Sequence, residues 1–168
     1  MNLLVTGLLI FVPMLIEAAR AARNERAQKA RGGIEPQDDV YNIMRVVYPA
    51  AFLAMLAEGA VRATPSTEST AVVIVGIVVF VAAKIIKWSA ILALGRAWTF
   101  RVIVVPGDTL VAIGPYRYFR HPNYIGVIGE LVGAALITRA LVTGPIAVVL
   151  FAILLQRRIA VEERALKI

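Results

Sequence analysis

The sequence predicts an all-α polytopic membrane protein with about five transmembrane helices. Hydrophobic residues make up 60% of the 168 residues and the mean hydropathy is +0.78, whereas soluble domains are about 45–50% apolar. Long apolar runs follow one another along the chain, and basic residues gather in alternate connections between them. A soluble core of this size cannot hide so much apolar surface. We therefore expect the excess to face lipid, in a single domain.

The apolar runs set the predicted spans, because a bilayer crossing takes about 20 residues, with a range of roughly 17–25. The first run is interpreted as a retained span, since no basic segment precedes it and no small-residue cleavage signal follows it. The last two runs reach the required length only if their basic ends lie among the headgroups, so they are predicted to form a tight hairpin of short helices. The runs cover positions 3–19, 40–61, 71–94, 124–137 and 142–159.

The connections after the successive spans hold five, one, four, one and four Lys and Arg residues. This alternation predicts an N-terminus outside and a C-terminus in the cytoplasm, because cytoplasmic connections are enriched in basic residues. The formal net charge of +7 therefore indicates topology and contact with anionic membrane lipids. The basic residues do not form a patch interleaved with aromatic residues, as a nucleic-acid interface would, so no nucleic-acid partner is predicted. The chain has no cysteine, and no metal site is predicted.

The cytoplasmic connection 95–123 is the longest polar segment. Its β-like run 100–105, the turn after it and the run 109–113 predict either a short hairpin or an irregular docked loop. Positions 114–124 then bring the only histidine, two arginines, three tyrosines and two prolines together before an apolar helix. Pro122 suits the first turn of that helix and disfavours helical geometry at His121. This composition at a helix start favours a ligand site over a plain connector.

Two further features carry charge close to the same membrane face. Arg158 and Glu162 are four residues apart, so they share a face if the last helix continues; a solvated helix end with an ordinary ion pair is the alternative. Glu130 lies six residues into the fourth span. A carboxylate at that depth costs about 2.5–3.5 kcal/mol on insertion scales. We expect Glu130 to be paired or to line a cavity.

Here the chain resembles the isoprenylcysteine carboxyl methyltransferase family. The string Arg120-His121-Pro122-Asn123-Tyr124, preceded by Gly114-Pro115-Tyr116, is similar to the family signature Y-x-x-x-R-H-P-x-Y. The tail R-x-x-x-E-E-x-x-L at 158–166 is similar to the family's C-terminal motif. The resemblance covers 95–166 well and 1–90 only as generic membrane spans. It implies a fold in which a cytoplasmic loop and tail form the cofactor site.

The resemblance also implies an S-adenosylmethionine-dependent enzyme that releases S-adenosylhomocysteine, with residue roles that carry over position by position. It implies Arg158 as the catalytic, substrate-facing arginine, and we add Glu130 as a candidate contact with the substrate. Glu162 matches the acidic residue on the cofactor. The remaining implied cofactor contacts are Asp108, Thr109, Leu110, Val111, Tyr116, His121, Pro122, Asn123 and Tyr124. No G-x-G-x-x-G follows a strand, which agrees with a family that has no Rossmann domain.

On this reading residues 1–168 form one integral membrane methyltransferase domain, with three spans in 1–94 and the catalytic loop, helical hairpin and tail in 95–168. The expected substrate is a lipophilic small molecule or lipidated molecule bearing a carboxylate or an acidic hydroxyl. Short members of the family are bacterial, which implies the bacterial inner membrane. The family's aromatic tail segment is missing here, so the cavity is closed by less protein or by a second copy in a homo-oligomer. Phospholipid amine N-methylation, NADPH-dependent steroid-type reduction and a non-enzymatic membrane scaffold stay open as alternatives.

Overall fold

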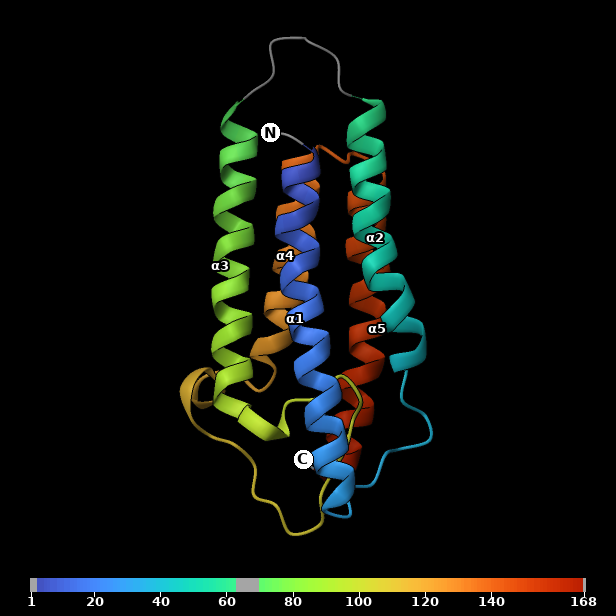
Figure 1. The fold of residues 1–168 in the computed structure, drawn as a ribbon, viewed down its shortest axis with the longest axis vertical. Helices are drawn as coiled ribbons and strands as arrows, with labels where there is room; N and C mark the ends of the chain where they lie inside the picture. Colours follow the sequence, from blue (N-terminus) through green and yellow to red (C-terminus); the bar gives the residue numbers. More distant parts are fainter. Residues whose placement is uncertain (1–2, 63–69, 168) are drawn as a thin grey trace.

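The computed structural model describes residues 3–62 and 70–167, and five α-helices aligned along one long axis make up most of these ranges (Figure 1). Two short 3-10 helices, η1 (Gly95–Ala97) and η2 (Gly114–Arg117), lie between the third and fourth helices. The described ranges contain no strand, which confirms the all-α prediction. The helices are α1 (Leu3–Ala30), α2 (Tyr41–Val61), α3 (Thr70–Leu94), α4 (Pro122–Thr138) and α5 (Thr143–Leu166).

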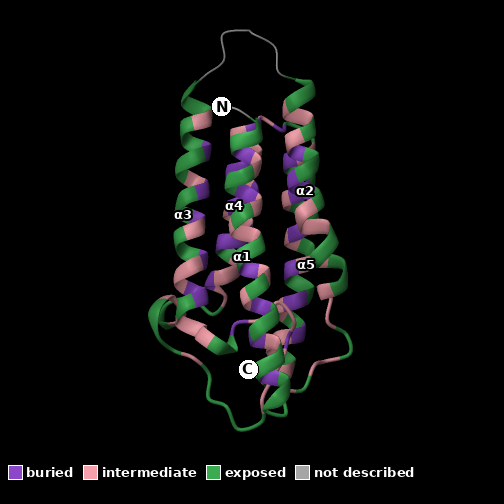
Figure 2. Cartoon of the chain, viewed as in Figure 1, coloured by how far each residue is buried: buried purple, intermediate pink, exposed green. Residues whose placement is uncertain are grey.

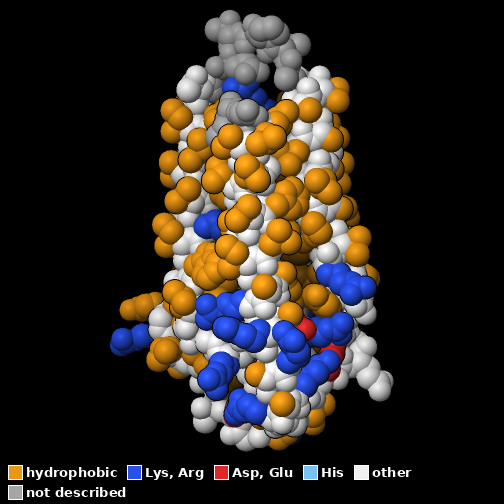
Figure 3. Space-filling model, in the orientation of Figure 1, with side chains coloured by type: hydrophobic (Ala, Val, Ile, Leu, Met, Phe, Trp, Pro, Cys, Tyr) orange, Lys and Arg blue, Asp and Glu red, His pale blue; other side chains and the backbone are white. Residues whose placement is uncertain are grey.

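The helices have the lengths and surfaces of a membrane protein. Helices α1, α2, α3 and α5 are long and apolar enough to cross a bilayer. Helix α4 has 17 residues, or about 25 Å at about 1.5 Å per residue, slightly less than the roughly 30 Å of a hydrocarbon core. On the face seen in Figure 3, hydrophobic side chains cover the upper part and Lys and Arg gather toward the lower end. Helix α1 begins at the upper end and α5 finishes at the lower end (Figure 1), as an odd number of crossings requires.

Helices α3 and α4 pack closely because α4 presents glycines to its neighbour. A Cβ atom at Gly126 would lie 2.7 Å from the Cβ of Lys87, and one at Gly133 would lie 2.7 Å from the backbone nitrogen of Phe80. Small residues at such spacing let transmembrane backbones approach, since lipid supplies no hydrophobic force between helices. The close α3–α4 contact fixes the start of α4, and with it His121 and Tyr124, against the rest of the bundle.

The apolar core lies between α2, α4 and α5, where Phe52, Met55, Leu131 and Phe151 are each at most 2% exposed. Buried positions face inward on every helix (Figure 2). Helix α1 differs because most of its buried side chains are polar: Thr6, Glu17, Asn24 and Gln28 against Ile10 and Ala21. Helix α1 therefore joins the bundle largely through polar contacts.

The structure corrects the ends of two predicted helices and chooses between the two alternatives for the loop. Helix α1 continues to Ala30, so the basic residues at 20–29 lie on helix rather than in a loop. The segment 99–113 forms no hairpin; it is the docked loop of the two alternatives, and Val104 pairs with Ile34 in an isolated antiparallel bridge. Only α4 is short, because α5 continues to Leu166. That continuation places Arg158 and Glu162 on one helical segment, as predicted.

Candidate functional site

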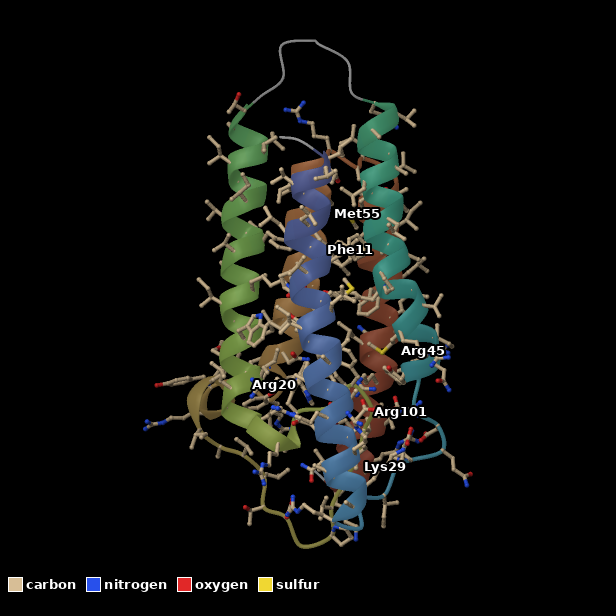
Figure 4. The ribbon with its side chains drawn as sticks, in the orientation of Figure 1. Phe11, Arg20, Lys29, Arg45, Met55 and Arg101 are labelled. Atoms are coloured by element: carbon tan, nitrogen blue, oxygen red, sulfur yellow. The ribbon has the colours of Figure 1, made fainter. Side chains whose placement is uncertain are left out.

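A cavity of about 540 Å³ is lined by residues from all five α-helices, from η1 and η2, and from the loop 98–111. Ligand sites typically occupy about 300–1,000 Å³, so its size fits a cofactor or substrate. One part is polar and belongs to the loop and the end of α5. The other part lies between the helices and is lined by apolar side chains that include Phe11, Met14 and Phe151. Figure 4 shows Phe11 and Met55 in the upper half of the bundle and Arg101 and Lys29 toward its lower end.

Ten of the twelve sequence-predicted site residues line this one cavity. They come from segments that are distant in sequence, namely the docked loop, η2, the start of α4 and the end of α5. The residues are Asp108, Thr109, Leu110, Val111, Tyr116, His121, Asn123, Tyr124, Arg158 and Glu162. Pro122 and Glu130 are not among the lining residues; Pro122 is buried at the first position of α4, where it starts the helix.

Arg158 is held from two sides. Its Nη1 donates to Oδ1 of Asp39 at 2.7 Å, and its Nε donates to the hydroxyl of Tyr124 at 3.0 Å. Within the described part of the chain, Nη2 of Arg158 has no hydrogen-bond partner. A planar guanidinium fixed at two nitrogens leaves a third to bind an oxygen in the cavity.

Tyr124 connects Arg158 to the acidic end of the tail. Its hydroxyl accepts from Arg158 and donates to Oε2 of Glu162 at 2.6 Å. His121 stacks on Tyr124, with ring centroids 5.5 Å apart and an interplanar angle of 16°. The Nε2 atom of His121 lies 3.3 Å from Oε1 of Glu163. The two motifs that lie far apart in the sequence thus form one contiguous polar wall.

Tyr116 completes that wall from η2, the short helix that begins at Gly114, whose φ of +58° favours glycine. Burial raises the pKa of the Tyr116 hydroxyl above its ordinary value, and the negative charge of Glu162 adds to the effect. The hydroxyl therefore stays protonated near neutral pH and is available as a hydrogen-bond donor.

The docked loop is anchored by α1, which the sequence did not reveal. The side-chain amide of Asn24 donates to the backbone oxygen of Trp98 at 2.7 Å, and Gln28 donates to that of Arg96 at 2.8 Å. Glu25 accepts from the backbone nitrogens of Phe100 and Arg101, at 3.1 and 3.2 Å. No local pattern in the sequence reveals these contacts, because each joins residues 68 to 76 positions apart.

Asp39 is the second feature that sequence reasoning missed. It lies in the connection between α1 and α2, and its side chain is only 5% exposed. Besides holding Arg158, it accepts from the backbone nitrogen of Val102 at 2.8 Å through Oδ2. Its one sequence signal is an acidic pair, Asp38-Asp39, in a connection assigned to the basic cytoplasmic side.

Glu130 was expected either to be paired or to line a cavity, and the structure shows that it is paired. It is 1% exposed, and its Oε2 accepts from the hydroxyl of Tyr48 at 2.7 Å and lies 3.1 Å from Nζ of Lys84. Lys87 lies 3.4 Å from Oε1 of Glu130 and 2.6 Å from Oε2 of Glu17. Glu130 is thus part of a buried charge cluster of Glu17, Lys84, Lys87 and Glu130, and its contact with a substrate stays a prediction. The cluster borders the cavity through Glu17 and Lys87, next to Tyr48.

Comparison with known proteins agrees with the motifs. A model described as the isoprenylcysteine carboxyl methyltransferase (ICMT) family matches residues 74–168, more than half of the chain. The uncharacterized protein YpbQ of Bacillus subtilis is 32% identical over 160 residues, which cover 95% of this chain and 93% of that protein. An uncharacterized protein of Haemophilus influenzae is 28% identical over 145 residues, 86% of this chain and 83% of that protein. No solved structure matches the chain. The chain therefore belongs to the isoprenylcysteine carboxyl methyltransferase family and is a methyltransferase of that type.

Proposed function

We propose that this methyltransferase uses S-adenosylmethionine to methylate an oxygen, in a carboxylate or an acidic hydroxyl, of a lipophilic substrate. The observation that carries the proposal is Arg158. Two partners fix its guanidinium, and Arg158 lines a cavity with a polar end and an apolar end. A lipid with an oxygen-bearing head matches both ends.

The residues at the polar end fit the proposed cofactor. Among the described residues, no acceptor contacts the backbone N–H groups of Thr109, Leu110 and Val111, so a segment that lines the cavity carries three unpaired donors. Glu162 supplies a carboxylate for a cationic ligand, and Oδ1 of Asn123 is buried without a protein partner.

S-adenosylmethionine, when bound, supplies an electrophilic methyl group on a sulfonium. The chain's own contribution is positioning, because near-attack placement of two reactants can account for about 7–11 kcal/mol of a barrier. Arg158 orients the acceptor oxygen and favours its ionised form, since a nearby positive charge lowers the pKa of an acidic group. The apolar part of the cavity, between α1, α2 and α5, receives the hydrocarbon portion.

We extend the proposal to location: a bacterial inner membrane, with the N-terminus outside and the cavity open to the cytoplasm. The gathering of Lys and Arg toward the cavity end of the bundle supports this orientation. The two relatives named above come from bacteria.

The first experiment is calorimetric titration of the detergent-purified full chain with S-adenosylhomocysteine. We expect micromolar binding that is lost in His121→Ala and Glu162→Ala. Arg158→Ala should keep most of this binding, because Arg158 lies on the acceptor side. Arg157→Ala is the matched control, since its neighbouring guanidinium lines a surface hollow rather than the cavity. Failure of the correctly folded wild type to bind would overturn the proposal, and binding of NADPH instead would indicate a reductase.

The second experiment identifies the acceptor group. The chain is incubated with methyl-labelled S-adenosylmethionine, a membrane lipid extract and a prenylated cysteine carrying a free carboxylate. Label released as volatile methanol by alkali indicates a methyl ester and hence a carboxylate acceptor, whereas alkali-stable label in a neutral lipid indicates an ether formed on a hydroxyl. Label in a phospholipid amine headgroup would refute O-methylation. Arg158→Ala should abolish transfer, with Arg157→Ala again as control.

A further inference from the structure

Asp39 uses both carboxylate oxygens inside the protein and has its side chain only 5% exposed. Its Oδ1 accepts from Nη1 of Arg158 at 2.7 Å and from the backbone nitrogen of Tyr41 at 3.0 Å. Its Oδ2 accepts from the backbone nitrogen of Val102 at 2.8 Å. A buried carboxylate is unfavourable unless it is fully paired, and this one is. Asp39 is not among the cavity's lining residues, so it acts on ligands only through its partners.

These partners belong to the two sides of the proposed reaction. Arg158 lies on the acceptor side. Val102 lies in the docked loop, shortly before Val104, which pairs with Ile34 in the isolated bridge. The loop then continues to Asp108 and to the unpaired backbone N–H groups of residues 109–111, which line the cavity. The loop has no sheet to fix it within the described ranges. One carboxylate thus connects the acceptor arginine to the loop that borders the proposed cofactor.

We propose that Asp39 is a positioning residue that sets the distance between the methyl acceptor and the cofactor loop. The inference rests on the proposed function and adds a residue that lies outside the segment 74–168 matched by the family model. Misplacement of reacting groups by about 1 Å can cost about 100-fold in rate. Loosening Arg158 should therefore lower turnover much more than it lowers cofactor affinity.

Two substitutions separate the functions of the two oxygens. Asp39→Asn keeps a carbonyl oxygen that can accept from Val102 N–H, but its NH₂ group faces Arg158 as a second donor. Asp39→Ala removes all three contacts, with Arg158, Tyr41 and Val102. The control is Asp38→Asn, together with Asp38→Ala; Asp38 is the adjacent carboxylate, 58% exposed, and pairs with Arg164 on the surface. All variants are compared with the wild type in the full chain, in detergent, after circular dichroism has verified their helical content.

For Asp39→Asn we expect binding of S-adenosylhomocysteine within about threefold of the wild type and methyl transfer to the lipid extract reduced about 100-fold. For Asp39→Ala we also expect binding to weaken about tenfold, because the loop loses an anchor. Both Asp38 variants should behave as the wild type.

Different results would contradict the proposed function and the role of Asp39. No binding of S-adenosylhomocysteine by the wild type overturns the proposed function itself. A wild type that binds, combined with an Asp39→Ala variant that binds equally well, overturns the loop half of the inference. Wild-type transfer rates in Asp39→Asn overturn the acceptor half. If Asp39→Ala does not fold, the separation of binding from transfer in Asp39→Asn still decides the question, because a merely structural role would lower both together.

Discussion

Glu130→Gln should destabilise the helix bundle strongly, because it removes one negative charge from a balanced buried cluster. Two carboxylates, Glu17 and Glu130, face two ammonium groups, Lys84 and Lys87, and the four side chains are 1–15% exposed. Removing one partner of a buried ion pair leaves an uncompensated charge and costs about 3–5 kcal/mol. Glutamine preserves the shape and an acceptor for Tyr48, so the change measures the charge rather than a cavity.

A second substitution that restores the charge balance tests whether the lost charge is the cause. Lys84→Met in the Glu130→Gln background leaves Lys87 and Glu17, whose Nζ and Oε2 atoms are 2.6 Å apart, as a neutral pair. We expect the double variant to be destabilised by less than the sum of the two single variants, with a coupling of about 0.5–3 kcal/mol.

The assay is equilibrium unfolding, by titration of sodium dodecyl sulfate into detergent micelles, followed by circular dichroism. Asp38→Asn is the control, since the exposed Asp38–Arg164 pair should contribute about 0–1 kcal/mol. A loss below about 1 kcal/mol in Glu130→Gln, or strict additivity in the double variant, would contradict this prediction, because it would mean that water or lipid headgroups already solvate the cluster.

Two further predictions concern helix packing and the docked loop. Gly133→Val should destabilise the protein by about 1–3 kcal/mol or more in the same titration, because a Cβ atom at this position would lie 2.7 Å from the backbone nitrogen of Phe80. Gly7→Ala is the control and should be neutral, because a Cβ atom there would have only one side-chain atom near it, at 3.9 Å. Although burial raises the pKa of Glu35, hydrogen bonds from Lys29 and Arg101 outweigh it and lower that pKa below its ordinary 4.5. A carboxylate whose pKa is lower in the folded state stabilises the protein at pH values above its unfolded-state pKa. This stabilisation is lost as the pH falls through the folded-state pKa. The stability difference between the wild type and Glu35→Gln should therefore be constant above about pH 4.5 and shrink below it; a difference that grows on acidification contradicts the assignment.

The helices and half of the site could be predicted because their signals are local. Apolar runs of bilayer length specify membrane helices whatever they pack against. Pro122 starts α4 because its ring fixes a backbone angle. The spacing of Arg158 and Glu162 gives a shared helical face because the helical period is fixed.

Which side chains hold Arg158 and the docked loop follows from the tertiary structure and not from any local pattern. Asp39 and Arg158 are 119 positions apart, and Asn24 holds the loop at Trp98 across 74 positions. Neither pairing leaves a periodic trace in the sequence. Likewise, the depth of Glu130 in the span predicts either a charged partner or a cavity, but it does not say which of the two is present. That depends on how closely the glycines of α4 let α3 approach, because α3 carries the lysines that pair with Glu130. Local patterns in the sequence specify the presence and order of the spans, their basic ends and the motifs. Long-range packing specifies the geometry of the site, since a hydrogen bond depends on proximity in space and not in the chain.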